Sequence, residues 1–217
     1  MGLRLKKWAV VAIITAFIYF AYLMFLITWQ YVPFNLEVSF LQLKEQISWW
    51  HYRAVFFTHV YTSIFILILG FFQFFSTLRV RFPRIHKNLG KAYIGLVLFL
   101  SAPSGLIMGY YGNGGIVTQF SFCLQAILWF FFTFLAYYYV RRGDFFKHFS
   151  FMALSYALTL SAISLRLFKW IIVNAWHLPT MDTYKIVAWL GWIFNVVVAI
   201  LIIARKNNKQ TEGKTIA

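Results

Sequence analysis

Two ionisable side chains lie inside long apolar runs of this sequence, where ionisable groups are rare. His59 lies in the run 54–76 and Arg166 in the run 149–173. Inside a membrane such residues usually face the protein interior or a water-filled cavity, and they often mark a working site. Counted from the ends of their runs, both lie roughly 8–11 Å below the same membrane surface. We therefore expect His59 and Arg166 to approach each other in the outer half of the membrane.

Polar residues continue from these two positions along one face of each predicted helix. One stripe has spacings of 7, 4 and 7 residues, which keeps its members within roughly 20° of one line on an α-helix. That stripe is His148, Ser155, Thr159 and Arg166. The other stripe is His59, Ser63, Gly70, Gln73 and Thr77. Small and polar stripes let membrane helices pack closely, so we expect these two helices to face each other or to share a cavity. The candidate substrate-binding residues on the stripes and on the two helices between them are Ser63, Gln73, Ser104, Gln125, Ser155 and Thr159.

A second candidate site is expected at the inner surface, where two histidines lie at the starts of helices. Pro83 suits the first turn of a helix, which places His86 at the inner end of the third helix, and His148 begins the fifth. Two histidines on facing helices at one depth could ligate a b-type haem, and arginine commonly pairs with the propionates. Haem b is therefore a candidate cofactor, with membrane electron transfer as the function and a redox partner or a second copy of the chain as partner. The same pair could instead hold zinc or copper.

The outer pair supports a different hypothesis, a carrier or sensor for a small anion, a lipid headgroup or a proton. Arginine binds carboxylate and phosphate groups, and histidine titrates near neutral pH. A hydrolase with Ser104 as nucleophile and His59 as base needs the two groups within about 3 Å, which a sequence alone does not establish. Whether the chain is an enzyme stays open, as does the alternative that these polar residues only bond neighbouring helices.

The composition shows which solvent surrounds the helices that carry these residues. The chain has 217 residues, of which 62% are hydrophobic and only 12% charged, whereas soluble domains are about 45–50% apolar and about 25% charged. A helix that crosses a bilayer needs roughly 20 apolar residues. Six such runs are present, approximately 8–28, 54–76, 93–110, 116–140, 149–173 and 184–204. A soluble enzyme and a disordered chain are excluded, and the lone Cys123 excludes a disulfide scaffold.

Most of the basic residues flank these runs on one side. Three precede the first run, five lie between the second and third, three between the fourth and fifth, and four follow the sixth, which makes fifteen of the 20 lysines and arginines. They are Arg4, Lys6, Lys7, Arg79, Arg81, Arg84, Lys87, Lys91, Arg141, Arg142, Lys147, Arg205, Lys206, Lys209 and Lys214. The positive-inside rule predicts a bacterial cytoplasmic (inner) membrane protein with both termini in the cytoplasm. The net charge of +15 is then explained by topology and by anionic lipid headgroups, without nucleic acid.

The expected architecture is all-α, with one integral membrane domain over 1–205 and a polar, basic cytoplasmic tail over 206–217. Helices two to five are expected to form a core four-helix bundle, with the first and sixth helices at its periphery. The first run is too long for the apolar part of a signal peptide and no cleavage site follows it, so we expect a retained helix. The longest connection, 29–53, is either an anchored loop or a lid over an outer cavity.

Two blocks of residues resemble an uncharacterised family of bacterial membrane proteins, the domain of unknown function 2306 family. The first block is His59, then Gly70-Phe71-Phe72-Gln73-Phe74, then Arg79 and Arg81-Phe82-Pro83-Arg84-Ile85-His86-Lys87-Asn88-Leu89-Gly90-Lys91-Ala92-Tyr93. The second is Arg141-Arg142-Gly143-Asp144, His148, Met152, Ser155-Tyr156-Ala157-Leu158-Thr159 and Leu165-Arg166. Lys87 and Lys91 stand where the family usually has arginine, and Phe149-Ser150-Phe151 replaces a more basic or tryptophan-containing triplet. The resemblance implies no reaction, but it includes His59, His86, His148 and Arg166.

Overall fold

The computed structural model describes residues 2–42 and 44–215, and describes side chains for residues 8–38, 41–42 and 44–208. Over these residues the secondary structure is entirely helical. The elements are α1 (Gly2–Trp29), α2 (Ser39–Gln42), the 3₁₀ helix η1 (Glu45–Ser48), α3 (Trp50–Gln73), α4 (Ser76–Arg81), α5 (Pro83–Leu96), the π-helix η2 (Val97–Ser101), α6 (Ala102–Tyr110), α7 (Ile116–Arg141), α8 (Phe145–Trp176) and α9 (Thr180–Thr215). The all-α prediction is confirmed for the described chain.

Six stretches of the described chain are long and apolar enough to cross a membrane, as predicted. The third differs most from its predicted range, because it extends from Pro83 to Tyr110 rather than from 93 to 110. Pro83 occupies the first turn of α5, where its missing N–H and fixed φ fit the start of a helix. The turns that follow are rich in basic and polar residues, so an apolar run alone does not reveal them.

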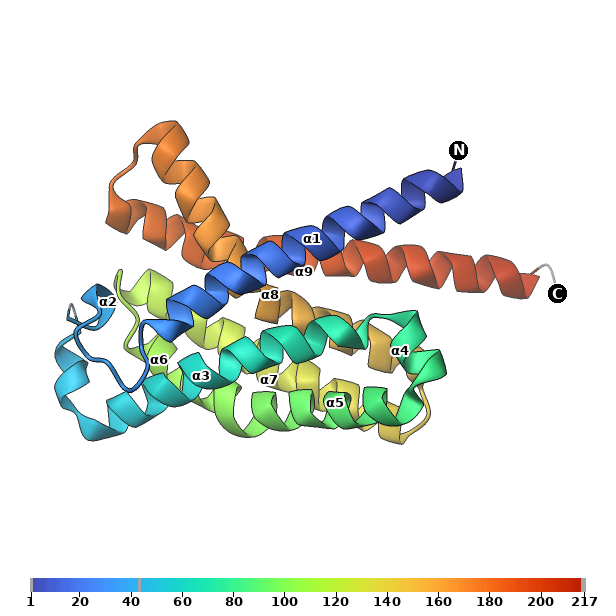
Figure 1. Ribbon diagram of the computed structural model, residues 1–217, viewed down its shortest axis with the longest axis horizontal. Helices are drawn as coiled ribbons and strands as arrows, with labels where there is room; N and C mark the ends of the chain where they lie inside the picture. The colour runs from blue at the N-terminus through green and yellow to red at the C-terminus, as the bar shows by residue number, and fades with distance from the viewer. Residues whose placement is uncertain (1, 43, 216–217) are drawn as a thin grey trace.

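Most helices run between two opposite ends of the molecule, and the hairpin between α8 and α9 projects away from the others (Figure 1). One end, named here the termini end, holds both chain ends, α4 and the turn 142–144. The opposite end, named the loop end, holds the segment 30–49 and the turn 111–115. The two termini thus share one end of the bundle, which an even number of spans requires. The basic segments of the sequence gather at this same end.

The buried centre of the helix assembly is built from aromatic side chains of different helices. Tyr93 is fully buried and lies against Tyr156, which donates a hydrogen bond of 2.9 Å to the carbonyl oxygen of Leu67. Gly70 permits this packing, because a Cβ there would lie 2.4 Å from the Tyr156 ring and 2.8 Å from Tyr93. A small residue of the predicted stripe therefore brings α3 into close contact with α5 and α8, as such residues do in membrane helices.

The last helix, α9, packs along α8 and α7. Gly191 of α9 lies against the backbone of Leu165, where a Cβ would approach the Leu165 Cα to 3.1 Å. The Trp192 indole donates a hydrogen bond of 2.9 Å to the Ser121 hydroxyl, and the Asn195 amide donates one of 3.1 Å to the Ala157 carbonyl. These polar contacts connect α9 to the two helices beside it.

The span that contains α5 and α6 is widened by one π-helical turn at η2. Pro103 lies just after this turn, in the first turn of α6. Proline has no N–H to donate to the fourth residue before it, so the regular helical hydrogen bonds cannot continue through this point. π-helical turns inside α-helices are frequently found at functional sites. The one in this chain presents the backbone of Ser101 to α3.

Candidate functional site

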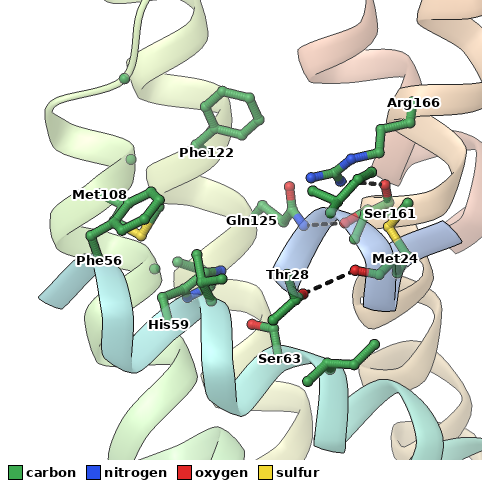
Figure 2. A pocket seen from close by; sticks show the side chains of 18 of the residues that line it. Met24, Thr28, Phe56, His59, Ser63, Met108, Phe122, Gln125, Ser161 and Arg166 are labelled. Carbon is green, nitrogen blue, oxygen red and sulfur yellow. Dashed lines mark hydrogen bonds between the residues drawn. The ribbon is translucent and has the colours of Figure 1, made fainter. Parts of the chain in front are cut away.

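The predicted outer pair borders a cavity of about 580 Å³ near the loop end. His59 of α3 and Arg166 of α8 both line it, together with residues of α1, α6, α7 and the segment 30–49. Figure 2 shows the Arg166 guanidinium and the Gln125 side chain extending into the space that His59 and Ser63 border on the other side. Most of the remaining lining is aliphatic or aromatic. The volume is in the range of small-molecule binding sites, which is about 300–1,000 Å³.

The His59 imidazole is held by the π-helical turn. Its Nδ1 lies 2.9 Å from the carbonyl oxygen of Ser101, and because a carbonyl can only accept, Nδ1 carries the proton. Nε2 is then the basic nitrogen, with no hydrogen bond to any described residue. Gly105 lies directly beside the ring, since a Cβ there would approach the His59 Cε1 to 3.0 Å. The structure therefore defines both the position and the tautomer of this imidazole.

Ser104 lies beside His59 but is not arranged as a nucleophile. Its Oγ is 3.4 Å from Nδ1, the nitrogen that already donates to Ser101, and it donates its own proton to the Leu100 carbonyl at 2.6 Å. A general base must present an unprotonated nitrogen to the hydroxyl that it activates. The geometry therefore gives no support to a hydrolytic pair of Ser104 and His59.

Arg166 has cationic charge that no carboxylate of the described chain neutralises. Its Nη1 donates a hydrogen bond of 2.8 Å to the Ala162 carbonyl of the preceding turn, and the side chain is exposed to the cavity. The ion pairs of the described residues are Lys147–Asp144 and Lys185–Asp182, and neither includes Arg166. The nearby groups that interact with it electrostatically are the Tyr31 and Tyr184 phenols. A guanidinium has five N–H donors, so most of them remain available to a ligand.

A second cation, Lys44, was not singled out from the sequence but lines the same cavity. Its ammonium group donates to the carbonyl oxygen of Tyr111 in the turn after α6, and the residue is only 4% exposed. Burial lowers the pKa of Lys44 below its usual value. Glu37 and Glu45 lie near it in the sequence, so the sequence of this segment is typical of a charged surface helix. Only the fold shows that Lys44 points inward.

Other predicted residues line the cavity as polar groups. The Gln125 amide donates to the Ser161 hydroxyl and to the Leu158 carbonyl, the latter at 3.3 Å. The Ser63 hydroxyl is buried in the lining and has no hydrogen-bond partner among the described residues. Thr159 lines the cavity as well. A ligand in the cavity could therefore bond the Ser63 hydroxyl that the chain itself leaves unbonded.

Thr159 also begins a chain of four buried hydroxyl groups that leads away from the cavity. The Tyr93 hydroxyl lies 3.0 Å from the Thr159 Oγ1 and 2.8 Å from the Ser155 Oγ, which lies 2.7 Å from the Thr133 Oγ1. Thr133 donates its proton to the Trp129 carbonyl at 2.7 Å. Because a carbonyl only accepts, the chain of donors runs from the cavity and ends at this backbone oxygen. Ser155, a predicted substrate-binding residue, lies inside this network rather than on the cavity wall.

The predicted inner pair lies toward the termini end. His148 Nδ1 is 2.9 Å from the Ala136 carbonyl oxygen, so Nε2 is its basic nitrogen. His86 Nδ1 is buried without a hydrogen-bond partner among the described residues, and the two imidazoles lie close enough to interact electrostatically. Gln73 lies at the same end, where its Oε1 faces Gly90 and its Nε2 has no described partner. No group of three or more histidine, cysteine or acidic ligands is found in the described chain.

Comparison with known proteins places the site within a family. The model of the family described as "Predicted membrane protein (DUF2306)" matches residues 56–203, which is more than half of the chain and includes His59, His86, His148 and Arg166. No curated protein and no solved structure matches the chain. The protein therefore belongs to the family of predicted membrane proteins with domain of unknown function 2306.

Proposed function

We propose that this membrane protein binds an anion in the cavity lined by His59 and Arg166, as a carrier or sensor. The observation that supports this best is the uncompensated charge of Arg166. None of the described residues that line the cavity is Asp or Glu, whereas the lining includes Arg166 and Lys44. A charge within the membrane is costly unless it is paired, and arginine remains protonated under physiological conditions. An anionic ligand supplies the missing countercharge.

His59 gives this site a proton acceptor close to the anion. Its Nδ1 proton is committed to the Ser101 carbonyl, so a proton that arrives from the cavity is bound at Nε2. An imidazole that becomes cationic attracts an anion more strongly, and an anion in turn favours the imidazolium. Proton uptake by His59 would therefore accompany anion binding, which is the coupling expected of a proton-linked carrier or a pH-sensitive sensor.

The membrane orientation follows from the clustering of basic residues at the termini end. The positive-inside rule assigns that end to the cytoplasm of a bacterium, where anionic headgroups contact the basic loops. The loop end and the cavity beneath it then belong to the outer half of the cytoplasmic membrane. In this orientation the anion comes from outside the cell or from the outer leaflet.

The test is equilibrium binding to the purified protein in lipid nanodiscs, measured by calorimetry, with empty nanodiscs as background. The anionic probes are acetate, inorganic phosphate, dodecanoate and dodecyl phosphate. At least one should bind, and Arg166→Gln should weaken that binding by about tenfold or more, the factor that corresponds to about 1.4 kcal/mol. Lys169→Gln is the matched control, because Lys169 lies on the same helix three residues later and does not line the cavity. If no probe binds, or if the two variants behave alike, the proposal is wrong.

A second candidate function is electron transfer through a b-type haem held by His86 and His148. The observation that favours it is the hydrogen bond of His148 Nδ1 to the Ala136 carbonyl, because ligating histidines typically donate their other ring nitrogen in this way. The unbonded Nδ1 of His86 adds a second buried nitrogen nearby. A bound haem would supply one-electron redox chemistry at the termini end.

An absorption spectrum of protein purified from haem-supplied cells tests this second candidate. A Soret band with sharp bands after dithionite reduction should be lost in His86→Ala and in His148→Ala and kept in His177→Ala, which changes a histidine in the turn between α8 and α9. A colourless protein would contradict the haem assignment and would leave the anion site unaffected.

A further inference from the structure

The cavity is larger and more apolar than an inorganic anion requires. It encloses about 580 Å³, and its walls include Met24 of α1, Ile64 and Leu67 of α3, and Leu158 of α8. A small hydrated anion at Arg166 would leave these walls in contact with water, which is unfavourable in proportion to the apolar area exposed. An uncharged apolar molecule would cover the walls but would leave Arg166 without a countercharge. Neither kind of ligand matches both features of the lining.

We infer that the ligand is an amphiphile with one acidic head and an apolar chain, bound with the head near Arg166 and Lys44 and the chain toward the middle of the membrane. This inference rests on the anion-binding function proposed above and names its ligand class. The head group is an oxyanion, a carboxylate or a phosphate monoester. Arginine can bind either one through two parallel hydrogen bonds.

The head is placed by the two cations and by the polar groups near the loop end. Arg166 enters from α8, and Lys44 enters from the segment 30–49. Lys44 is already fixed by its bond to the Tyr111 carbonyl, so little side-chain entropy is lost when an anion binds there. Tyr31, in the same segment, lines the cavity as well and interacts electrostatically with Arg166. We place the acidic head among these three side chains.

The apolar chain of the ligand would lie against the apolar side chains that line the rest of the cavity. Thr159 is seven residues from Arg166 along α8, which is about 10 Å further toward the middle of the membrane. Met24 of α1 and Ile64 and Leu67 of α3 belong to one buried apolar cluster and line the cavity, and Leu158 of α8 lines it as well. The apolar part of an amphiphile would cover these side chains and would extend along the membrane normal, as lipid chains do. The cavity therefore matches an acidic lipid that has left the bilayer.

The experiment uses the nanodisc assay proposed above and compares probes that differ either in the acidic head or in the apolar chain. Dodecanoate carries head and chain, acetate carries the head alone, and dodecanol carries the chain without charge. We expect dodecanoate to bind at least tenfold more tightly than acetate and than dodecanol. Arg166→Gln should weaken both dodecanoate and acetate. Ile64→Phe, which adds bulk to the apolar part of the lining, should weaken dodecanoate severalfold and leave acetate unchanged.

Phe65→Leu is the matched control on α3, because Phe65 is exposed on the outside of the helix and does not line the cavity. Thermal unfolding of each variant verifies that it is folded. If acetate binds as tightly as dodecanoate and Ile64→Phe affects neither, the amphiphile is wrong while the anion site stands. If dodecanol binds as tightly as dodecanoate, the proposal that the ligand has an acidic head is wrong. If no anion binds, both the anion-binding function and the amphiphilic ligand are wrong. Competition between dodecanoate and dodecyl phosphate then shows which oxyanion the head carries.

Discussion

The His59 Nδ1 lies 2.9 Å from the carbonyl oxygen of Ser101, and this one contact connects the π-helical turn to the cavity. The acceptor is backbone, so the contact depends on the path of the chain rather than on the side chain of residue 101. The Ser101 hydroxyl has its own partner, the Thr62 hydroxyl of the adjacent α3 turn. Two neighbouring residues of α3 thus bond the same turn, and the imidazole is fixed with its basic nitrogen free.

The space beside this imidazole predicts the effect of Gly105→Ala. The new Cβ would lie 3.0 Å from the His59 Cε1 and 3.2 Å from its Nδ1, so the ring must shift by a few tenths of an ångström from its position beside Ser101. Overpacking of this kind costs about 1–3 kcal/mol. We expect both Gly105→Ala and His59→Ala to weaken dodecanoate binding by about tenfold. Calorimetry in nanodiscs provides the measurement.

Gly95→Ala is the control for this change, because nothing lies within 4 Å of a Cβ at Gly95. Gly95 lies in the same span, in the turn before η2. Its replacement should leave binding unchanged, because alanine is more favourable than glycine inside a helix. Equal binding by the Gly105 and Gly95 variants would show that the position of the His59 ring does not matter to the ligand.

The titration of Lys44 should make the affinity for an anion fall as the pH rises in the alkaline range. Burial lowers its pKa, so the ammonium form is present below that lowered value and is lost as the pH rises through it. Affinity for dodecanoate should therefore fall over a window that begins below the ordinary lysine pKa. Lys44→Arg should remove the fall, because arginine stays charged there, and Lys44→Met should bind severalfold more weakly with a flat profile. Burial raises the pKa of Tyr31, which keeps that neighbour neutral through more of the window.

Stability should change with the opposite sign over the same window. The folded chain favours the neutral amine, so the unfolded chain binds more protons and the free energy of unfolding rises with pH as Lys44 deprotonates. Thermal unfolding without ligand, followed against pH, should show this rise in wild type and lose it in Lys44→Arg. A parallel fall of binding and stability would indicate general alkaline denaturation instead.

The sequence predicted the spans and the shared cavity of His59 and Arg166 because helical periodicity and apolar length are local properties. The lone Asn195 of the last span bonds α8, as polar residues in membrane helices commonly do. The inward direction of Lys44 was not predictable, since it depends on how a short irregular segment folds over other helices. Ser155 illustrates a related limit. Ser155 belongs to the polar face predicted from the spacing. Whether its hydroxyl faces a cavity or other hydroxyl groups depends on Tyr93 and Thr133 of two other helices.

Tyr93→Phe should destabilise the protein through the buried hydroxyl chain. The Tyr93 oxygen bridges Ser155 and Thr159, and its removal leaves both hydroxyls without that partner. A lost hydrogen bond of this type is worth about 1 kcal/mol, which lowers Tm by about 2–4 °C in a chain of this size. Tyr137→Phe is the matched control, because Tyr137 is 42% exposed on the outside of α7. Equal melting temperatures for the two variants in the same detergent would show that the network adds no stability.

The orientation of the cavity can be tested with single cysteines, because the native chain has only Cys123. In a Cys123→Ser background, Trp50→Cys places a thiol at the loop end, where Trp50 is 75% exposed, and Val80→Cys places one on α4 at the termini end, where Val80 is 77% exposed. The positive-inside rule predicts that a membrane-impermeant maleimide labels the first variant in intact spheroplasts and the second only in inverted vesicles. Unsubstituted Cys123→Ser protein gives the background in both preparations. The reverse pattern would place the mouth of the cavity at the cytoplasm, and the anion would then be a cytoplasmic or inner-leaflet molecule.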